Sequence, residues 1–158
     1  MTYPLSKPAE AGMDIGSEEA SSTSGSATSG PATSGSAPVR VLVVEDESIV
    51  AMYLTDVLED MEYEVCGVAA SGAEALAIAE RERPSLALVD IGLAGAQDGI
   101  ETARALRDRF SVGSVFMSGA SDPELLKRAG TVQPHGFLQK PYDADQLKSV
   151  LERVFAGP

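Results

Sequence analysis

Short apolar runs alternate with amphipathic stretches from Val39 onward, and this alternation constrains the fold more than any other feature of the chain. Each run is short and rich in Val, Leu, Ala or Phe, as expected of strands that are buried on both faces. The runs cover 39–44, 65–69, 86–89, 115–117 and 136–138. Continuous apolar strands separated by helices predict a parallel sheet with helices on both faces.

The intervening stretches carry apolar residues at helical spacing, which predicts one helix after each strand. The expected helices cover about 50–61, 71–83, 100–110, 122–129 and 143–154. Ser71 with Glu74 three residues later matches a capping box, and Asp122 followed by Pro123 matches an N-cap and a first helical residue. Asp143 is the expected cap of the last helix. The pattern therefore predicts an α/β domain of five strands and five helices.

Residues 1–38 differ from the rest of the chain in composition, since Ser, Gly, Ala, Thr and Pro dominate them. The triplet Thr-Ser-Gly recurs at 23–25, 28–30 and 33–35. Small polar residues at this density bury too little apolar surface to offset the entropy of the chain. We therefore expect a disordered tail at 1–38 and one domain at 39–158, with a tether or docking arm as the alternative for the tail.

The charge balance is strongly acidic, with 12 Lys and Arg against 24 Asp and Glu and a formal net charge of −12. Such a surface repels phosphate backbones and anionic lipids, so direct binding to nucleic acid or to a membrane surface is disfavoured. Basic protein partners or a bound cation fit better. Cys66 is the only cysteine, which excludes an internal disulfide. Because there is no leader segment and no apolar run of membrane length, we expect a cytoplasmic protein.

Polar residues occupy the positions where four of the predicted strands end. Glu45 and Asp46 follow the first strand, Asp90 follows the third, Ser118 the fourth and Lys140 the fifth. The carboxyl ends of parallel strands form one edge of the sheet, and ligands bind at that edge in folds of this kind. Three carboxylates, a hydroxyl and an ammonium group are therefore expected to converge there.

The chemistry of this set points to phosphoryl transfer. Carboxylates this close repel one another unless a cation joins them, and hard oxygen ligands suit Mg²⁺. In this interpretation Asp90 attacks phosphorus and forms an aspartyl phosphate, while Lys140 and Ser118 bind phosphoryl oxygens. Each residue alone also fits an ordinary helix start, turn or surface position, and only the joint arrangement indicates a site.

Other catalytic groups are poorly supported. His135 is the only histidine and has no cysteine or histidine cluster beside it, and Cys66 lies in an apolar run typical of the core. The sequence contains no Gly-x-Ser-x-Gly elbow and no phosphate-binding loop that ends in Lys-Ser or Lys-Thr.

Taken together, these motifs resemble the receiver domain of two-component response regulators over about residues 39–156. The matching stretches are Val41-Leu42-Val43-Val44-Glu45-Asp46-Glu47, Leu86-Ala87-Leu88-Val89-Asp90-Ile91, Asp98-Gly99-Ile100-Glu101, Phe116-Met117-Ser118-Gly119-Ala120 and Gly136-Phe137-Leu138-Gln139-Lys140-Pro141. The resemblance implies a flavodoxin-like, doubly wound fold whose five parallel strands have the order 2-1-3-4-5. It also implies that a sensor histidine kinase or a histidine phosphotransfer protein donates the phosphoryl group to Asp90.

The resemblance assigns a metal site to the acidic residues. Asp46 would bind Mg²⁺ directly and Glu45 would bind it through water, together with Asp90 and the backbone carbonyl of Gly92. The loop from Asp90 to Asp98-Gly99 departs from the pattern of the family. It is one residue longer than the commonest form and has Ala94 where that form has proline. This departure concerns the shape of the loop and not Asp90 itself.

The resemblance also assigns a switch. Ser118 would be the hydroxyl that moves toward the phosphoryl group, and Phe137 the aromatic ring that turns inward as it does so. Lys140 matches the lysine of the family, and Pro141 the proline of its cis peptide bond. Since Phe137 has no hydroxyl, its switching would depend on packing alone.

The resulting hypothesis is a stand-alone phosphorylation switch that lacks a DNA-binding output and changes its affinity for a downstream protein. It is not an enzyme in the usual sense, although it assists its own phosphorylation and dephosphorylation. Homodimerisation through the last two helices and the fifth strand is a further expectation. A phosphorelay shuttle, a phosphate sink and a degenerate receiver that only binds proteins are the alternatives. A haloacid-dehalogenase-type phosphatase is disfavoured because Gly92 occupies the position of its second aspartate.

Overall fold

A computed structural model of the chain describes residues 37–93, 98–119 and 122–156. The predicted tail at 1–38 falls almost entirely outside these residues, and so does Ala94 in the loop after Asp90. The disordered tail and the domain boundaries therefore remain predictions.

The alternation of strands and helices is confirmed. The described residues form β1 (Arg40–Val44), α1 (Ser48–Asp60), β2 (Glu64–Ala69), α2 (Gly72–Glu82), β3 (Leu86–Asp90), α3 (Gly99–Phe110), β4 (Gly113–Ser118), α4 (Pro123–Gly130), β5 (Gly136–Gln139) and α5 (Ala144–Ala156). The largest difference from the predicted strands is at β4, which begins two residues before the expected start at Val115.

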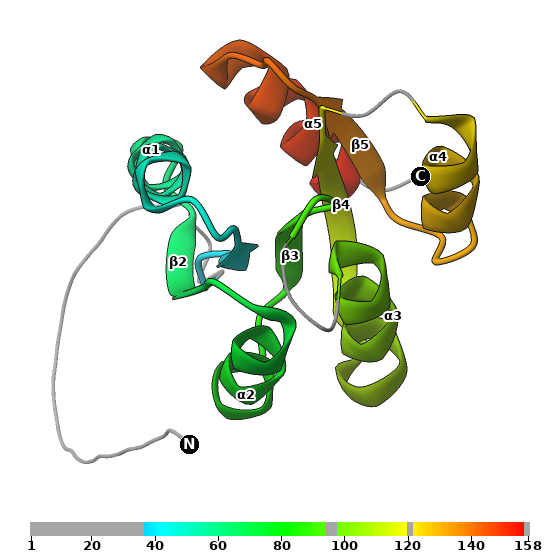
Figure 1. Cartoon of the computed structure of the whole chain (residues 1–158). Coiled ribbons are helices and arrows are strands. Elements are labelled where there is room, and N and C mark those ends of the chain that lie inside the picture. Colours follow the sequence, from blue (N-terminus) through cyan, green and yellow to red (C-terminus); the bar gives the residue numbers. More distant parts are fainter. Residues whose placement is uncertain (1–36, 94–97, 120–121, 157–158) are drawn as a thin grey trace, which may run out of the picture. The chain divides into compact units, whose positions relative to one another are not determined.

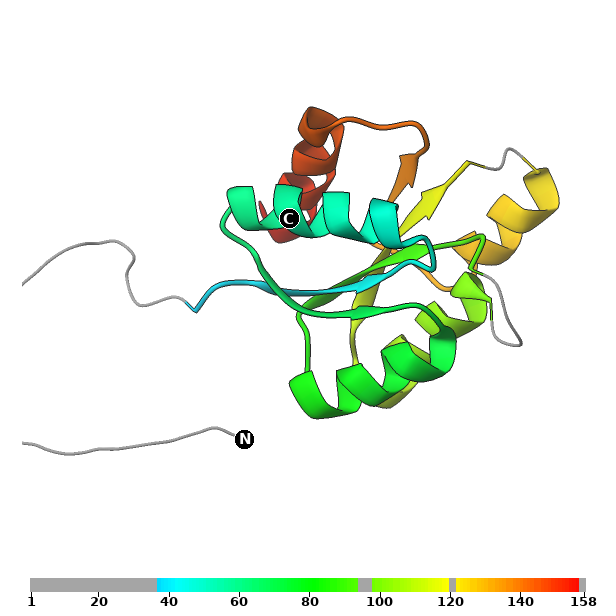
Figure 2. The ribbon, with the colours of Figure 1, turned by 60° about the vertical axis from the view of Figure 1, so that its left-hand side comes forward.

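The five strands form one parallel sheet with the order β2-β1-β3-β4-β5, as expected for a doubly wound fold (Figure 1). Helices α1 and α5 cover one face, and α2 and α3 cover the other (Figure 2). Alternate residues of each central strand supply the two cores: Leu42 and Val44 point toward α2 and α3, whereas Val41 and Val43 point toward α1 and α5. This is why the strands read as continuous apolar runs.

The edge strand β2 departs from that pattern. Only Ala69 of its six residues is buried, and Val68 is 43% exposed. Cys66, expected to be a small core residue, is half-buried against the core on the α2 side, and this burial raises the pKa of its thiol. Because β2 has a neighbour on one side only, its apolar run did not guarantee burial.

The predicted helix caps are present, with one change of partner. Ser71 Oγ accepts a hydrogen bond from Glu74 N, but the Glu74 carboxylate accepts from Ala70 N instead of the backbone of Ser71. Asp143 and Gln146 form a reciprocal pair at the start of α5, with N···O distances of 2.9 and 2.8 Å. Local side-chain bonds thus start these helices where the sequence indicated.

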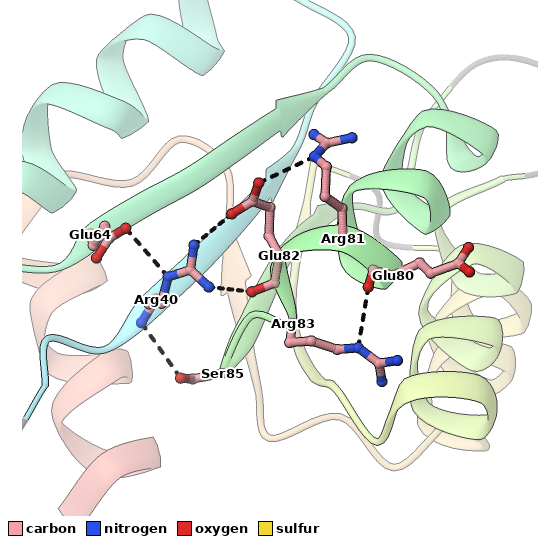
Figure 3. A network of polar contacts seen from close by, with 7 residues as sticks. All are labelled: Arg40, Glu64, Glu80, Arg81, Glu82, Arg83 and Ser85. Atoms are coloured by element: carbon pink, nitrogen blue, oxygen red, sulfur yellow. Dashed lines mark hydrogen bonds and ion pairs between the residues drawn. The ribbon is translucent and has the colours of Figure 1, made fainter. Parts of the chain in front are cut away.

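A polar network connects the amino ends of β1 and β2 with the end of α2 (Figure 3). It lies at the opposite end of the strands from the predicted site. Arg40, the first residue of β1, forms ion pairs with Glu82 at 2.7 Å and Glu64 at 3.3 Å. Its guanidinium also donates to the Glu82 carbonyl at the end of α2. Glu82 lies beside two arginines, and the hydrogen bond from Arg40 is the main cause of its lowered pKa.

No helix in the described ranges is long and apolar enough to cross a membrane.

Candidate functional site

The predicted site residues lie at one edge of the sheet, because parallel strands bring their carboxyl ends together. Glu45 directly follows β1, Asp90 ends β3, Ser118 ends β4, and Lys140 directly follows β5. The first three are buried, with exposed fractions of 2%, 7% and 6%. Polar side chains that are buried at strand ends need hydrogen-bond or ion-pair partners.

Lys140 provides the positive charge of the site. Its Nζ lies 3.4 Å from Asp90 Oδ2 and 3.6 Å from Glu45 Oε1. The second oxygen of Asp90, Oδ1, accepts a hydrogen bond from Gly92 N at 3.0 Å. Asp90 is thus held by one ammonium group and one backbone N–H, with its carboxylate nearly buried at the sheet edge.

Three carboxylates gather beside this pair. Glu45, Asp46 and Asp90 each place a carboxylate oxygen within 4.8 Å of the others. Glu45 Oε2 accepts from Glu47 N at 3.1 Å, whereas the buried Oε1 has no hydrogen-bond donor among the described residues. Burial, and to a smaller extent the charge of Asp90, raise the pKa of Glu45 to about 6, against the opposing effect of the Glu47 N–H.

This donor set fits a divalent cation. A buried carboxylate oxygen that lacks a donor, beside two further carboxylates, leaves negative charge that protein groups neutralise only in part. Carboxylate oxygens are the ligands that Mg²⁺ prefers, and the exposed Asp46 leaves the cluster open to water on one side.

The residues assigned to a switch lie on the neighbouring strands. Lys140 N donates to the Ser118 carbonyl at 2.8 Å, which ties the end of β5 to the end of β4. Phe137 in β5 is 43% exposed, and its ring centroid is 5.8 Å from that of Phe116. The peptide bond between Lys140 and Pro141 is cis.

Two residues that contact the site region, Gly99 and Tyr142, were given no role of their own from the sequence. A Cβ atom at Gly99 would overlap the backbone carbonyl of Asp90, so α3 starts directly against Asp90. The sequence contained one signal for this contact: Asp98 is a good N-cap residue, and Gly99, which follows it, has no side chain. The half-buried Tyr142 donates to Met117 Sδ at 3.5 Å, and burial raises its pKa to about 12. No sequence pattern indicated that contact.

Comparison with known proteins gives a family match over most of the described domain. The family model of the response regulator receiver domain matches residues 41–152. The transcriptional regulatory protein PdtaR of Mycobacterium tuberculosis is 32% identical over 117 residues, which cover 74% of this chain and 57% of that protein. The phyllosphere-induced regulator PhyR of Methylorubrum extorquens is 31% identical over 115 residues, which cover 72% of this chain and 42% of that protein.

Solved structures agree on the fold. The signal receiver domain of a modulated diguanylate cyclase from Desulfovibrio desulfuricans G20 is 40% identical, with a TM-score of 0.72, covering 76% of this chain and 95% of that one. The chemotaxis protein CheY4 of Vibrio cholerae is 29% identical, with a TM-score of 0.69, covering 75% of this chain and all of that one. The matched region is therefore about the size of a whole receiver domain, but it spans only about half the length of the curated relatives.

Proposed function

This chain belongs to the response regulator receiver family, and we propose that its Asp90 accepts a phosphoryl group from a sensor histidine kinase or a histidine phosphotransfer protein. Receiver domains are signalling switches that interact with such donors and with downstream targets. One observation carries the assignment of the acceptor: Asp90 lies 3.4 Å from Lys140 Nζ, at the sheet edge where three carboxylates meet.

The transfer follows from this geometry. An oxygen of the Asp90 carboxylate attacks the phosphorus of a phosphohistidine, and a P–O bond forms as the P–N bond breaks. The electron pair of the broken bond stays on the imidazole, which takes up a proton. Lys140 and the Ser118 hydroxyl bind phosphoryl oxygens and offset their charge. The same groups would assist the reverse loss of the phosphoryl group, when water attacks phosphorus.

Glu45, Asp46, Asp90 and the carbonyl of Gly92 would hold the Mg²⁺ ion that receiver domains use. When bound, the ion neutralises charge on the phosphoryl oxygens during transfer. Glu45 would contribute to this site, since Lys140 and the Glu47 N–H neutralise its buried carboxylate only in part.

The signal would leave the site through Ser118 and Phe137 and reach the face formed by α4, β5 and α5. A hollow of about 420 Å³ on this face is lined by residues of β5 and α5, among them Phe137, Gln146 and Arg153. An exposed aromatic ring beside a hollow suits a protein partner or a second copy of the domain. We infer that phosphorylation changes binding at this face.

A phosphorelay shuttle or a phosphate sink would use the same acceptor and differ only in the fate of the phosphoryl group. A degenerate receiver that only binds proteins is disfavoured, because both Asp90 and Lys140 are present and lie within ion-pair distance.

The test is phosphorylation by acetyl phosphate with Mg²⁺, followed by intact-protein mass spectrometry. We expect the mass of one phosphoryl group to be added to the full chain and to be absent from Asp90→Asn. Unphosphorylated wild-type protein, or a modification that persists in Asp90→Asn, would disprove the proposal. Phosphotransfer from purified histidine kinases of the source organism then identifies the donor.

A further inference from the structure

Helix α4 buries little of its apolar surface. Of its eight residues only Ala129 is buried, and Leu126 is 38% exposed. By contrast, α3 buries five residues, including Ile100 and Leu106. Since apolar burial is the main source of helix attachment, the position of α4 depends unusually strongly on its other contacts.

Three arginines make polar contacts between α3 and either α4 or the segment that follows it. Arg104 Nη2 in α3 lies 3.1 Å from Thr131 Oγ1, and Arg107 Nη1 donates to the Val132 carbonyl at 2.5 Å. Both attach α3 to the segment that follows α4. The third, Arg128, extends from α4 itself to the start of α3.

Arg128 connects the two chain segments that leave the phosphorylation site. Its Nη2 is 3.2 Å from Asp98 Oδ2 and 3.7 Å from Glu101 Oε2. Asp98 is the N-cap of α3, next to Gly99, which packs on the Asp90 carbonyl. The helix that carries Arg128 begins only five residues after Ser118. One side chain thus bridges the segment after the acceptor and the segment after the switch hydroxyl.

We propose that Arg128 is a positioning residue, which holds α4 against the start of α3 and must release before Ser118 can move toward a phosphoryl group on Asp90. This inference rests on the proposed function. The connection from Ser118 to α4 is short, so a displacement of the hydroxyl toward Asp90 shifts the start of α4. Breaking the contact in advance therefore raises the population of the arrangement that accepts phosphate.

The size of the effect follows from the exposure of the pair. The side chains of Arg128 and Asp98 are 47% and 36% exposed, so water and salt screen their attraction. An ion pair of this kind changes a two-state population by roughly two- to fivefold. A change of this size has little effect on the folding equilibrium. It has a large effect on a switch whose two states differ little in free energy.

The experiment measures the initial rate of phosphorylation of the full chain by acetyl phosphate with Mg²⁺ in low salt. We expect Arg128→Gln to be phosphorylated roughly two- to fivefold faster than wild type, and Arg128→Lys to restore most of the wild-type rate. Lys127→Gln is the matched control, because it makes the same change of net charge on the same helix without an ion pair among the described residues. Raising the salt concentration should move the wild-type rate toward that of Arg128→Gln.

A merely structural role would leave the rate unchanged or lower it, so either result for Arg128→Gln overturns the inference, as does an equal gain in Lys127→Gln. Glu101→Gln removes the second partner and should give a smaller increase in the same direction, which serves as the test if Arg128→Gln does not fold. A wild-type chain that is not phosphorylated contradicts the proposed function instead, so the two failures are distinguishable.

Discussion

Gly99 packs directly on the backbone carbonyl of Asp90, and no side chain fits between them. The contact places the first residue of α3 directly against the end of β3. Asp98 supports the arrangement by accepting a hydrogen bond from Glu101 N at 2.9 Å. Both contacts fix the start of α3 next to Asp90.

Replacing Gly99 with Ala should destabilise the domain, because a Cβ atom would overlap the Asp90 carbonyl and force the backbone apart. We expect a loss of about 3 kcal/mol in the free energy of unfolding, measured by urea denaturation. Gly130→Ala is the control, since a Cβ atom at this last residue of α4 meets nothing within 4 Å. Equal stability of the two variants would contradict the packing described.

Replacing Glu45 with Gln should stabilise the protein at pH 7 in the presence of EDTA. Burial raises the pKa of Glu45 to about 6, so the folded state binds the proton more tightly than the unfolded state. Stability in the metal-free protein is therefore lost as pH rises from about 4.5 through 6. Removing the charge should recover about 2 kcal/mol at pH 7 and nothing at pH 4, by chemical denaturation at each pH. A difference between variant and wild type that does not depend on pH would refute this explanation.

Lys140→Met should slow phosphorylation by acetyl phosphate about 100-fold, because the ammonium group that offsets phosphoryl charge is lost. The rate is measured by intact-protein mass spectrometry under saturating Mg²⁺. Lys148→Met changes the net charge equally on the exposed side of α5 and should react at the wild-type rate. If the two variants react equally fast, the proximity of Lys140 to Asp90 has no role in the transfer.

Ser114→Ala should raise the free energy of unfolding by about 1 kcal/mol, because the buried Ser114 Oγ has no hydrogen-bond partner among the described residues. Thr102→Val provides the opposite case: Thr102 Oγ1 is equally buried but donates to the Asp98 carbonyl at 2.8 Å, so its loss should cost about 1 kcal/mol. Thermal and urea unfolding check both signs, and a stability loss in Ser114→Ala would show that its hydroxyl is satisfied.

The sequence predicted the elements of this fold because the relevant physics is local. Apolar periodicity distinguishes the strands from the helices, and caps such as Ser71 and Asp143 act on backbone groups within three residues. The edge strand shows where local information ends. Val68 lies in an apolar run like those of the central strands, yet it is 43% exposed because β2 has one neighbour only.

The candidate site was predictable for a related reason. Once the strands are parallel, their carboxyl ends meet, so Asp90, Ser118 and Lys140 could be placed together without knowing any distance. The positions of these residues in the sequence could not indicate how far Lys140 neutralises the carboxylates of the site. The orphaned oxygen of Glu45 and its raised pKa follow from burial in the folded domain, against the opposing charge of Lys140, which lies 95 residues away in the sequence.

By itself, the sequence determined which segments become strands and helices, because this depends on apolar periodicity. It also determined which polar residues lie at the carboxyl ends of the strands, because this depends on strand direction. Only the tertiary structure decided that Gly99 rests on Asp90 and that Arg128 reaches Asp98 from another helix. Such contacts join residues whose local patterns are independent, and their geometry exists only when the packed core fixes the distance between the elements that carry them.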